Sequence, residues 1–185
     1  MNPIDGLDSG TDYFFHFQRD LGPWKEILTP FMRSANLLGG MLAQALLALA
    51  ILGLLLYLGR KRQAGILGII IFLAVVLGEG LKWLVGANRP PDAEKFLGPK
   101  MSPSFPNVSA LLTGMLLLIL AMSLSTIIQR RFLRYLIYGV CLLLVLLIGA
   151  SQLYLGLHFL TDLLAGWTAG VLLALVWSWW TLPAA

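Results

Sequence analysis

A chain of 185 residues in which 58% of the residues are hydrophobic and only 12% are charged is too apolar for a soluble globular protein. Together with a mean hydropathy of +0.83, this composition indicates a single integral membrane domain. The net charge of +4 is small and spread over several loops, which argues against a nucleic-acid partner.

The first 36 residues are the least apolar part of the chain. They lack a basic start followed by an apolar run, so we expect no cleaved signal peptide. Aromatic side chains around His16 suit the headgroup zone, and residues 24–33 are predicted to form an interfacial helix. We interpret His16 as structural or interfacial. Residues 1–36 are therefore predicted to be an N-terminal interfacial segment, followed by a membrane-embedded bundle over 37–185.

Five apolar segments of membrane-spanning length follow, at about residues 37–59, 64–86, 106–127, 132–150 and 159–181. Glycines in LLGG, LGEG and LAGW would let neighbouring helices approach closely. The predicted fold class is all-α, an integral membrane bundle with an N-terminal interfacial helix. It has five transmembrane helices, or six if the first 36 residues hide a further crossing.

Basic loops predict the orientation of this bundle. Two short loops carry cations and no acid, namely Arg60, Lys61 and Arg62 after the first span and Arg130, Arg131 and Arg134 after the third. Such loops are typical of the cytoplasmic side. We therefore expect a cytoplasmic C-terminus in a plasma (inner) membrane, and a non-cytoplasmic face where residues 82–89, 102–109 and 158–162 meet.

Charged residues stand near the end of the second span. Glu79 and Lys82 are three residues apart, where unpaired charges would be costly, so we expect them to pair or to face an aqueous cleft. Lys82 and Arg89 are two helical turns apart if the helix persists, and both could then point at one anion. The alternative is that these cations are snorkelling anchors at a span end.

A proline-rich stretch precedes the third span. Pro103 and Pro106 suit the start of a helix, and Ser104 or Asn107 can cap it. Exposed N–H groups at such a start can bind an anion. A plain capped entrance to the span is the alternative.

His158 and Asp162 lie four residues apart where an apolar run breaks. In a helix this spacing would stack both side chains on one face, so that the carboxylate accepts a hydrogen bond from one imidazole nitrogen. The other nitrogen would remain free to act as a nucleophile or a base.

Taken together, these segments resemble the type 2 phosphatidic acid phosphatase family, which also contains vanadium haloperoxidases and glucose-6-phosphatase. The resemblance covers residues 79–167: a lysine, six residues and Arg-Pro at Lys82 and Arg89, then SFPNVSA, then SQLYLGLHFLTD followed by LLAGW. It implies a helical membrane bundle with an outward-facing site and no cofactor. It also implies that Lys82 and Arg89 bind phosphate, that His158 attacks phosphorus to form a phosphohistidine, and that Asp162 orients His158.

Two motifs depart from the family pattern. The family has PSGH where this chain has Pro106-Asn107-Val108-Ser109, and Ser-Arg where it has Ser151-Gln152. The resemblance therefore makes Asn107, Ser109 and Gln152 candidate phosphate-binding residues with altered chemistry. Gln152 carries no charge, which could cost about 10³-fold in rate. Ser109 cannot protonate a leaving alkoxide, which forfeits roughly 10² to 10⁴ more.

Three functional hypotheses follow. The first is a divergent family member with weak or lost catalysis, a pseudoenzyme that retains an anionic-lipid pocket and could serve as a subunit of a larger membrane assembly. The second is an active phosphatase of lipid phosphates or polyprenyl diphosphates, a hydrolase acting through phosphohistidine. The third is a transporter of anionic lipid. All three imply a phospholipid or polyprenyl phosphate as ligand, and the first adds protein partner subunits.

Three other features support less specific predictions. The two histidines are far apart in sequence and no cysteine or carboxylate cluster accompanies them, so we predict no metal site. The single cysteine, Cys141, lies in an apolar run and is expected to pack in the core. Trp177, Trp179 and Trp180 are interpreted as an aromatic belt, with a partner surface as the alternative.

Overall fold

Six helices make up the part of the chain that the computed structural model describes, namely residues 22–90, 93 and 102–181; no strand occurs within these ranges. The helices are α3 (Trp24–Leu38), α4 (Met41–Tyr57), α5 (Lys61–Val85), α7 (Val108–Ser125), α8 (Arg131–Tyr154) and α9 (Leu160–Thr181). The all-α fold class is confirmed.

Four of these helices, α5, α7, α8 and α9, are long and apolar enough to cross a bilayer. The bent pair of α3 and α4, which meet at an angle of 46°, makes a fifth crossing if the two together count as one span. The protein is therefore an integral membrane protein. The possible sixth crossing concerns residues 1–36, of which residues 1–21, including His16, lie outside the described residues. The rest of that stretch belongs mainly to α3.

The first predicted span, 37–59, is wrong at its start. A helix is present over the predicted 24–33 segment but runs on as α3 to Leu38, and α4 begins only at Met41. The interfacial position of this helix stays a prediction. Between them lies Gly39, where an added Cβ would stand 2.6 Å from Cγ2 of Ile148. The chain can bend this close to α8 only because Gly39 has no side chain. Periodicity alone does not reveal such a break.

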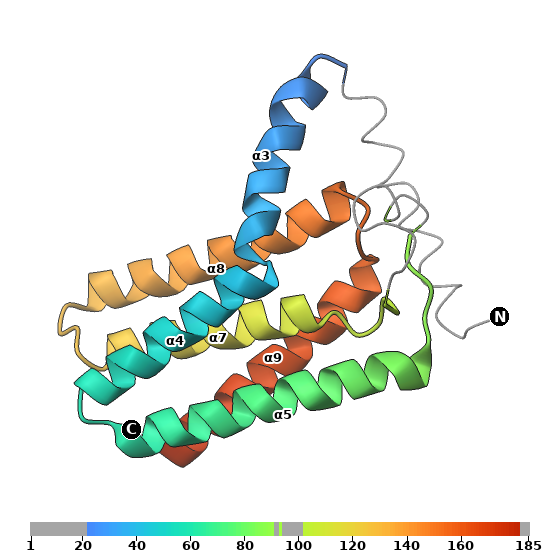
Figure 1. Ribbon diagram of the computed structural model, residues 1–185. Helices are drawn as coiled ribbons and strands as arrows, with labels where there is room; N and C mark the ends of the chain where they lie inside the picture. The colour runs from blue at the N-terminus through green and yellow to red at the C-terminus, as the bar shows by residue number, and fades with distance from the viewer. Residues whose placement is uncertain (1–21, 91–92, 94–101, 182–185) are drawn as a thin grey trace.

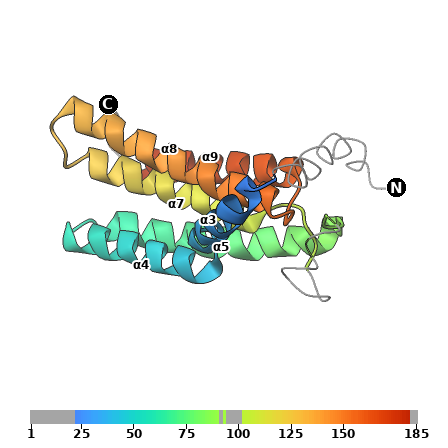
Figure 2. The same ribbon diagram turned by 90° about the horizontal axis from the view of Figure 1, so that it is seen from above.

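Helix α7 lies at the centre of the bundle, where it packs against α4, α5, α8 and α9. Figure 2 shows α4 and α5 on one side, α7, α8 and α9 on the other, and α3 leaving the bundle. Glycines of α9 permit the closest helix pair: a Cβ at Gly166 would stand 2.5 Å from the carbonyl oxygen of Asn107. The predicted role of the LAGW glycine in close helix packing is confirmed.

The largest buried side chain, Trp177, belongs to the apolar core formed by α4, α5, α7 and α9. Its indole N–H donates to the carbonyl of Gln63 at 3.1 Å. Both interpretations of Trp177, as part of an aromatic belt and as a partner surface, are therefore wrong. Trp179 and Trp180 are exposed, with relative accessibilities of 82% and 61%.

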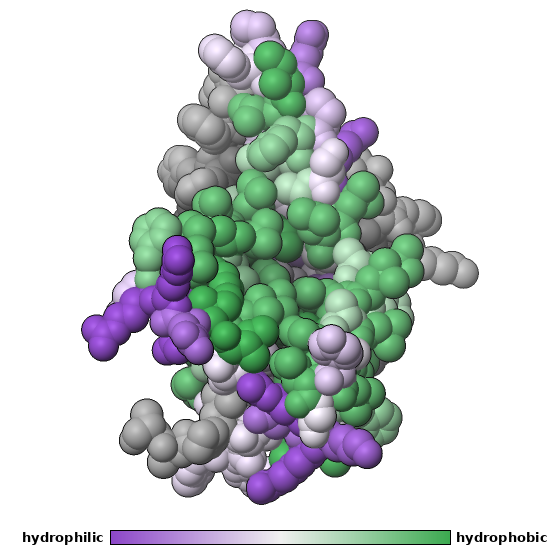
Figure 3. All heavy atoms as spheres, turned by 90° about the vertical axis from the view of Figure 1, so that its left-hand side faces the viewer, coloured by the Kyte–Doolittle hydropathy of each residue, from purple (hydrophilic) through white to green (hydrophobic). Residues whose placement is uncertain are grey.

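The two ends of the bundle differ in charge. The α4–α5 and α7–α8 connections lie together at one end, on the left of Figure 1, and the end of α9 lies there as well. Hydrophilic side chains gather in two groups on this end, seen in Figure 3, where Lys61, Arg62, Arg130, Arg131 and Arg134 are exposed. At the opposite end α5 and α8 finish and α7 and α9 begin, which brings all the candidate site residues to one end.

Candidate functional site

His158 lies in the connection between α8 and α9, not on a helix, so the predicted helical stacking of His158 and Asp162 is wrong. The pair still meets, because Asp162 stands in the first turn of α9 and its Oδ2 is 3.3 Å from Nδ1 of His158. The same oxygen accepts a hydrogen bond from the backbone N–H of Phe159 at 2.9 Å. Asp162 thus holds both the start of α9 and the imidazole. His158 is 7% exposed and Asp162 1%.

Arg89 reaches His158 from the other side. Helix α5 ends at Val85, and Gly86 adopts a left-handed conformation with φ 61°, so the helix does not persist to Arg89 as the two-turn spacing assumed. The Arg89 Nη1 lies 3.0 Å from Nε2 of His158 and 3.0 Å from the Leu157 carbonyl. Its Nε donates to the carbonyl of Ser102 at 2.8 Å.

These contacts determine the tautomer of His158. A guanidinium has only donors, so Nε2 facing Arg89 must accept, and the ring proton then resides on Nδ1. That N–H points to the carboxylate of Asp162. The imidazole consequently carries a lone pair on the nitrogen that faces the cation.

Ser104, which the sequence indicated only as a possible helix cap, completes this cluster. Its hydroxyl donates to Oδ2 of Asp162 and lies 3.3 Å from Nδ1 of His158. Ser104 is fully buried, and its backbone N–H donates to the carbonyl of Ala87 at 2.9 Å. The flanking prolines were the available signal, because they restrict the backbone of this segment. They could not reveal where the hydroxyl points.

Lys82 is buried near the end of α5, where its ammonium donates to Oε1 of Glu79 at 2.7 Å. The predicted pairing of these two residues is confirmed. Lys82 also acts on His158 through space, since its charge helps to lower the pKa of the imidazole.

The pKa of His158 lies below its ordinary value. Burial is the largest cause, and the charges of Arg89 and Lys82 act in the same direction, whereas Asp162 opposes them. Burial also lowers the pKa of Arg89, opposed by Asp162 and Glu79. The imidazole is therefore neutral at neutral pH, the form in which nitrogen can act as a nucleophile.

A second polar cluster lies beside the first. Asn107 caps α7 by accepting from the N–H of Ala110 at 3.0 Å, and its Nδ2 donates to Oε1 of Gln152 at 2.7 Å. Gln152 in turn donates to Oγ of Ser109 at 3.1 Å, and this hydroxyl donates to the Gly39 carbonyl at 2.6 Å. Asn107 and Gln152 are 1% and 4% exposed.

Gln44 on α4, which sequence reasoning missed, joins the second cluster. Its Nε2 lies 2.7 Å from the carbonyl of Ser109, 3.2 Å from the Ser109 hydroxyl and 2.9 Å from Oγ1 of Thr113. A glutamine inside an apolar segment was the available signal, since buried amides in membranes need partners. Its partners on α7 depend on how the helices pack.

A family model described as the PAP2 superfamily matches residues 63–184. The chain belongs to the PAP2 superfamily. This confirms the resemblance, because that model covers the segments at both the retained and the substituted positions.

The PAP2 fold is also found by structural comparison. The chain is similar to the crystal structure of a transmembrane PAP2-type phosphatidylglycerolphosphate phosphatase from Bacillus subtilis, with a TM-score of 0.79 and 22% sequence identity. The match covers 95% of this chain and 86% of that one. The comparison with curated proteins gave no match.

Apart from Lys82, the retained and the substituted positions of the PAP2 pattern lie in two adjacent hydrogen-bonded clusters. Arg89, His158 and Asp162 belong to the first cluster, together with Ser104. Asn107, Ser109 and Gln152 belong to the second, where their polar groups are hydrogen-bonded to one another and to the backbone. The phosphate-binding roles expected for these three residues remain predictions.

Val108, at the position of the PAP2 glycine, packs against α5. An added Cβ at Gly78 of α5 would stand 2.7 Å from Cγ2 of Val108, so the valine packs against that glycine. Val108 is 6% exposed. Its extra bulk therefore occupies the α5–α7 contact.

The titratable residues of this end do not form a metal centre. Within the described ranges no group of three histidine, cysteine or carboxylate residues is close enough to hold an ion. The arrangement is that of two cations and a carboxylate-backed imidazole, which suits an anionic ligand.

Proposed function

We propose that this PAP2 protein binds the phosphate group of an anionic membrane lipid at Lys82, Arg89 and His158, and that its hydrolytic activity is weak or lost. One observation carries the proposal: the three substituted residues, Asn107, Ser109 and Gln152, are hydrogen-bonded to one another beside the retained cluster. Their donors and acceptors already have partners in the protein. A phosphate bound there would have to displace those bonds.

The retained cluster supplies the binding chemistry. Arg89 offers planar donors suited to a phosphoryl group, and Lys82 adds a compact charge. Lys82 is paired with the Glu79 carboxylate. Among the described residues, Arg89 bonds only to the His158 imidazole, to backbone carbonyls and to the Ser102 hydroxyl. A phosphate dianion is a stronger acceptor than an imidazole or a carbonyl, so it can take over the Arg89 donors.

Weak catalysis follows from the second cluster. Phosphoryl transfer spreads charge over three oxygens, and loss of one cationic partner at Gln152 costs about 10³-fold. Ser109 has no proton to give near neutral pH, which costs roughly 10² to 10⁴ more. Its hydroxyl is also committed to the Gly39 carbonyl.

Active hydrolysis is the second candidate function, favoured by the tautomer of His158. The lone pair on Nε2 could attack phosphorus, forming an N–P bond while the P–O bond to the leaving group breaks; water would then release phosphate from the phosphohistidine. A diphosphate substrate leaves as a phosphate ester anion and needs little protonation. Any surviving activity should therefore favour polyprenyl diphosphate over phosphatidic acid.

The proposed site faces the non-cytoplasmic side of a plasma membrane, with the C-terminus in the cytoplasm. The exposed arginines and lysine of the two basic connections support this orientation, because they lie at the end opposite to His158.

The test is a purified-protein comparison of binding and phosphate release. Vesicles containing phosphatidic acid, phosphatidylglycerol phosphate or polyprenyl diphosphate are the probes. Wild type should bind the first of these in a manner that Arg89→Ala abolishes, with phosphate release close to background. Binding unaffected by Arg89→Ala would refute the proposed site.

A restored variant sharpens the test of weak catalysis. Combining Asn107→Ser, Val108→Gly, Ser109→His and Gln152→Arg restores the PAP2 pattern and should raise phosphate release by at least about 10³-fold. Adding His158→Ala should remove the gain. Rapid release by wild type, with a phosphohistidine that His158→Ala eliminates, would instead establish the second candidate.

A further inference from the structure

An apolar groove runs along the membrane part of the bundle between α5 and α9, with α7 as its floor. Its volume is about 460 Å³. The lining includes Leu73 and Leu81 of α5, Ala165 and Ala169 of α9, and Phe105 with Pro106. Small residues on both walls make the space, and none of the lining side chains is polar.

One end of the groove reaches the candidate site. Phe105 and Pro106 lie directly between Ser104, which binds Asp162, and Asn107 of the second cluster. On the α5 wall, Leu81 immediately precedes Lys82. An apolar channel that ends beside two cations has the polarity of an amphiphile with an anionic head.

We propose that this groove holds a hydrocarbon chain of the lipid whose phosphate binds at Arg89 and Lys82. The placement depends on the proposed function, because the head group sets which end of the lipid lies at Phe105. The α5 wall from Leu73 to Leu81 spans about 12 Å, at 1.5 Å per residue. The groove can therefore hold a substantial part of one chain.

The groove contributes position more than affinity. A chain leaving the bilayer for an apolar groove gains little hydrophobic free energy, since lipid tails are as apolar as leucine. Fixing the chain does hold the phosphate at a defined height beside His158. A ligand with a free phosphate and a long chain should thus be selected over a short-chain phosphate ester.

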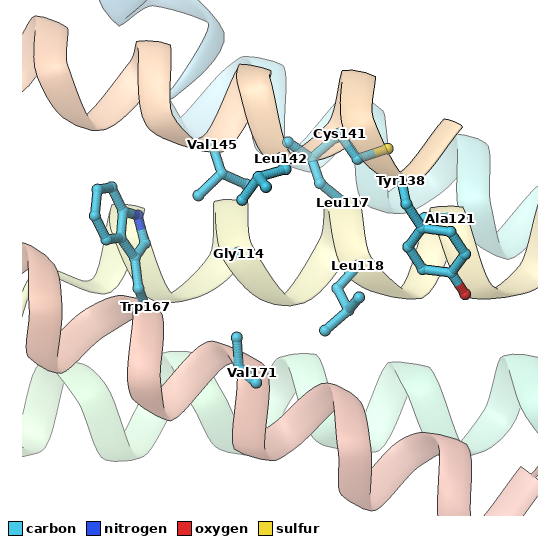
Figure 4. A pocket seen from close by; sticks show the side chains of 10 residues that line it. All are labelled: Gly114, Leu117, Leu118, Ala121, Tyr138, Cys141, Leu142, Val145, Trp167 and Val171. Carbon is cyan, nitrogen blue, oxygen red and sulfur yellow. The ribbon is translucent and has the colours of Figure 1, made fainter. Parts of the chain in front are cut away.

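A second apolar pocket provides a control. It lies between α7, α8 and α9 and is shown in Figure 4, with Trp167 at one end and Tyr138 at the other. A Cβ at Gly149 would collide with the Trp167 ring, so this ring lies against α8 and separates the pocket from the site end. Its lining includes no residue of the 102–107 segment. Val171 lines this pocket, whereas Ala169, two residues away on α9, lines the groove.

Photocrosslinking tests the groove without requiring catalysis. The probe is phosphatidic acid with a diazirine in one acyl chain, added to wild type in lipid nanodiscs, and labelled peptides are mapped by mass spectrometry. Label should be found on α5 within 73–81 and on α9 within 165–173. Ala169→Phe should lower it by about tenfold, because a phenyl ring overpacks the groove. Val171→Phe should leave it unchanged.

The possible outcomes test the chain-binding groove and the proposed phosphate site independently. Label on α8 or on lipid-facing surfaces, with Arg89→Ala still reducing it, would overturn the groove and leave the proposed function standing. Groove label that Arg89→Ala does not change would support the chain site and overturn the proposed phosphate site. Thermal unfolding checks that Ala169→Phe is folded, and Ala165→Leu replaces it if it is not.

Discussion

The hydrogen bond from Arg89 to Nε2 of His158 controls the state of the imidazole in the free protein. It directs the ring proton to Nδ1 and the Asp162 carboxylate, which leaves a lone pair facing the cation. Arg89 therefore occupies the position from which a phosphate would meet Nε2 in the proposed site. If phosphate binds as proposed, this guanidinium must move away from the imidazole.

His158 should make stability depend on pH. Its pKa in the folded protein is lowered, chiefly by burial, so below about pH 6.5 the unfolded chain takes up a proton that the folded chain resists. Stability should fall as the pH drops through about 6.5, with a limiting slope of about 1.4 kcal/mol per pH unit from this group. Thermal unfolding in detergent should show a smaller fall for His158→Gln. An equal fall in both proteins would contradict the expectation.

Ser104 should stabilise the same cluster. Ser104→Ala removes a donor from the buried Asp162 carboxylate, which we expect to cost about 1–3 kcal/mol of unfolding free energy. Ser178→Ala is the control, because its hydroxyl donates to the Leu175 carbonyl at an exposed site. Denaturant titrations of both variants measure the difference. A loss no greater than that of the control would show that Ser104 does not support Asp162.

At the scale of helices, the second polar cluster ties the α3–α4 bend to the centre of the bundle. The Ser109 hydroxyl binds the Gly39 carbonyl, which is free to accept because the helix breaks there. Gln44 on α4 reaches the same serine and Thr113. The positions that depart from the PAP2 pattern thus coincide with bonds that join α4 and α8 to α7.

Gln44→Leu should loosen this junction. It removes an amide that bonds to Ser109 and Thr113, and we expect a loss of about 1–2 kcal/mol in unfolding free energy. Hydrogen exchange should rise around Gly39 and Gly40. Gln129→Leu, at an exposed position after α7, is the matched control. Unchanged exchange at the bend would argue that the junction holds without Gln44.

For the whole molecule, the bundle separates a basic end from the end that carries the candidate site. Both basic connections are short and exposed, and His158 lies at the far ends of the same helices. Because the positive-inside rule orients such loops toward the cytoplasm, the site and the groove should be open to the outer leaflet.

Cysteine labelling on intact cells tests the orientation. In a Cys141→Ala background, Asn88→Cys at the site end should react with a membrane-impermeant maleimide. Gln129→Cys in the α7–α8 connection should react only after permeabilisation, since both positions are exposed but lie at opposite ends. The reverse pattern would place the site in the cytoplasm.

The sequence by itself determined the membrane class, the helices and the PAP2 membership. Long apolar runs require helices in a bilayer, because backbone groups there must bond within their own segment. The motif spacing around Lys82, Arg89, His158 and Asp162 carried the family resemblance. Helix formation depends on local composition, and family membership depends on the order and spacing of motifs along the chain.

Only the tertiary structure decided how the site residues are partnered. The packing of separate segments places Ser104 beside Asp162 and Gln44 beside Ser109. It also decides that His158 lies outside α9 and that Trp177 is buried. The division between a retained cluster and a self-bonded substituted cluster has the same origin. Hydrogen-bond partners that are far apart in sequence produce no periodic pattern in it. The direction in which each of these side chains points is set by the neighbouring helices.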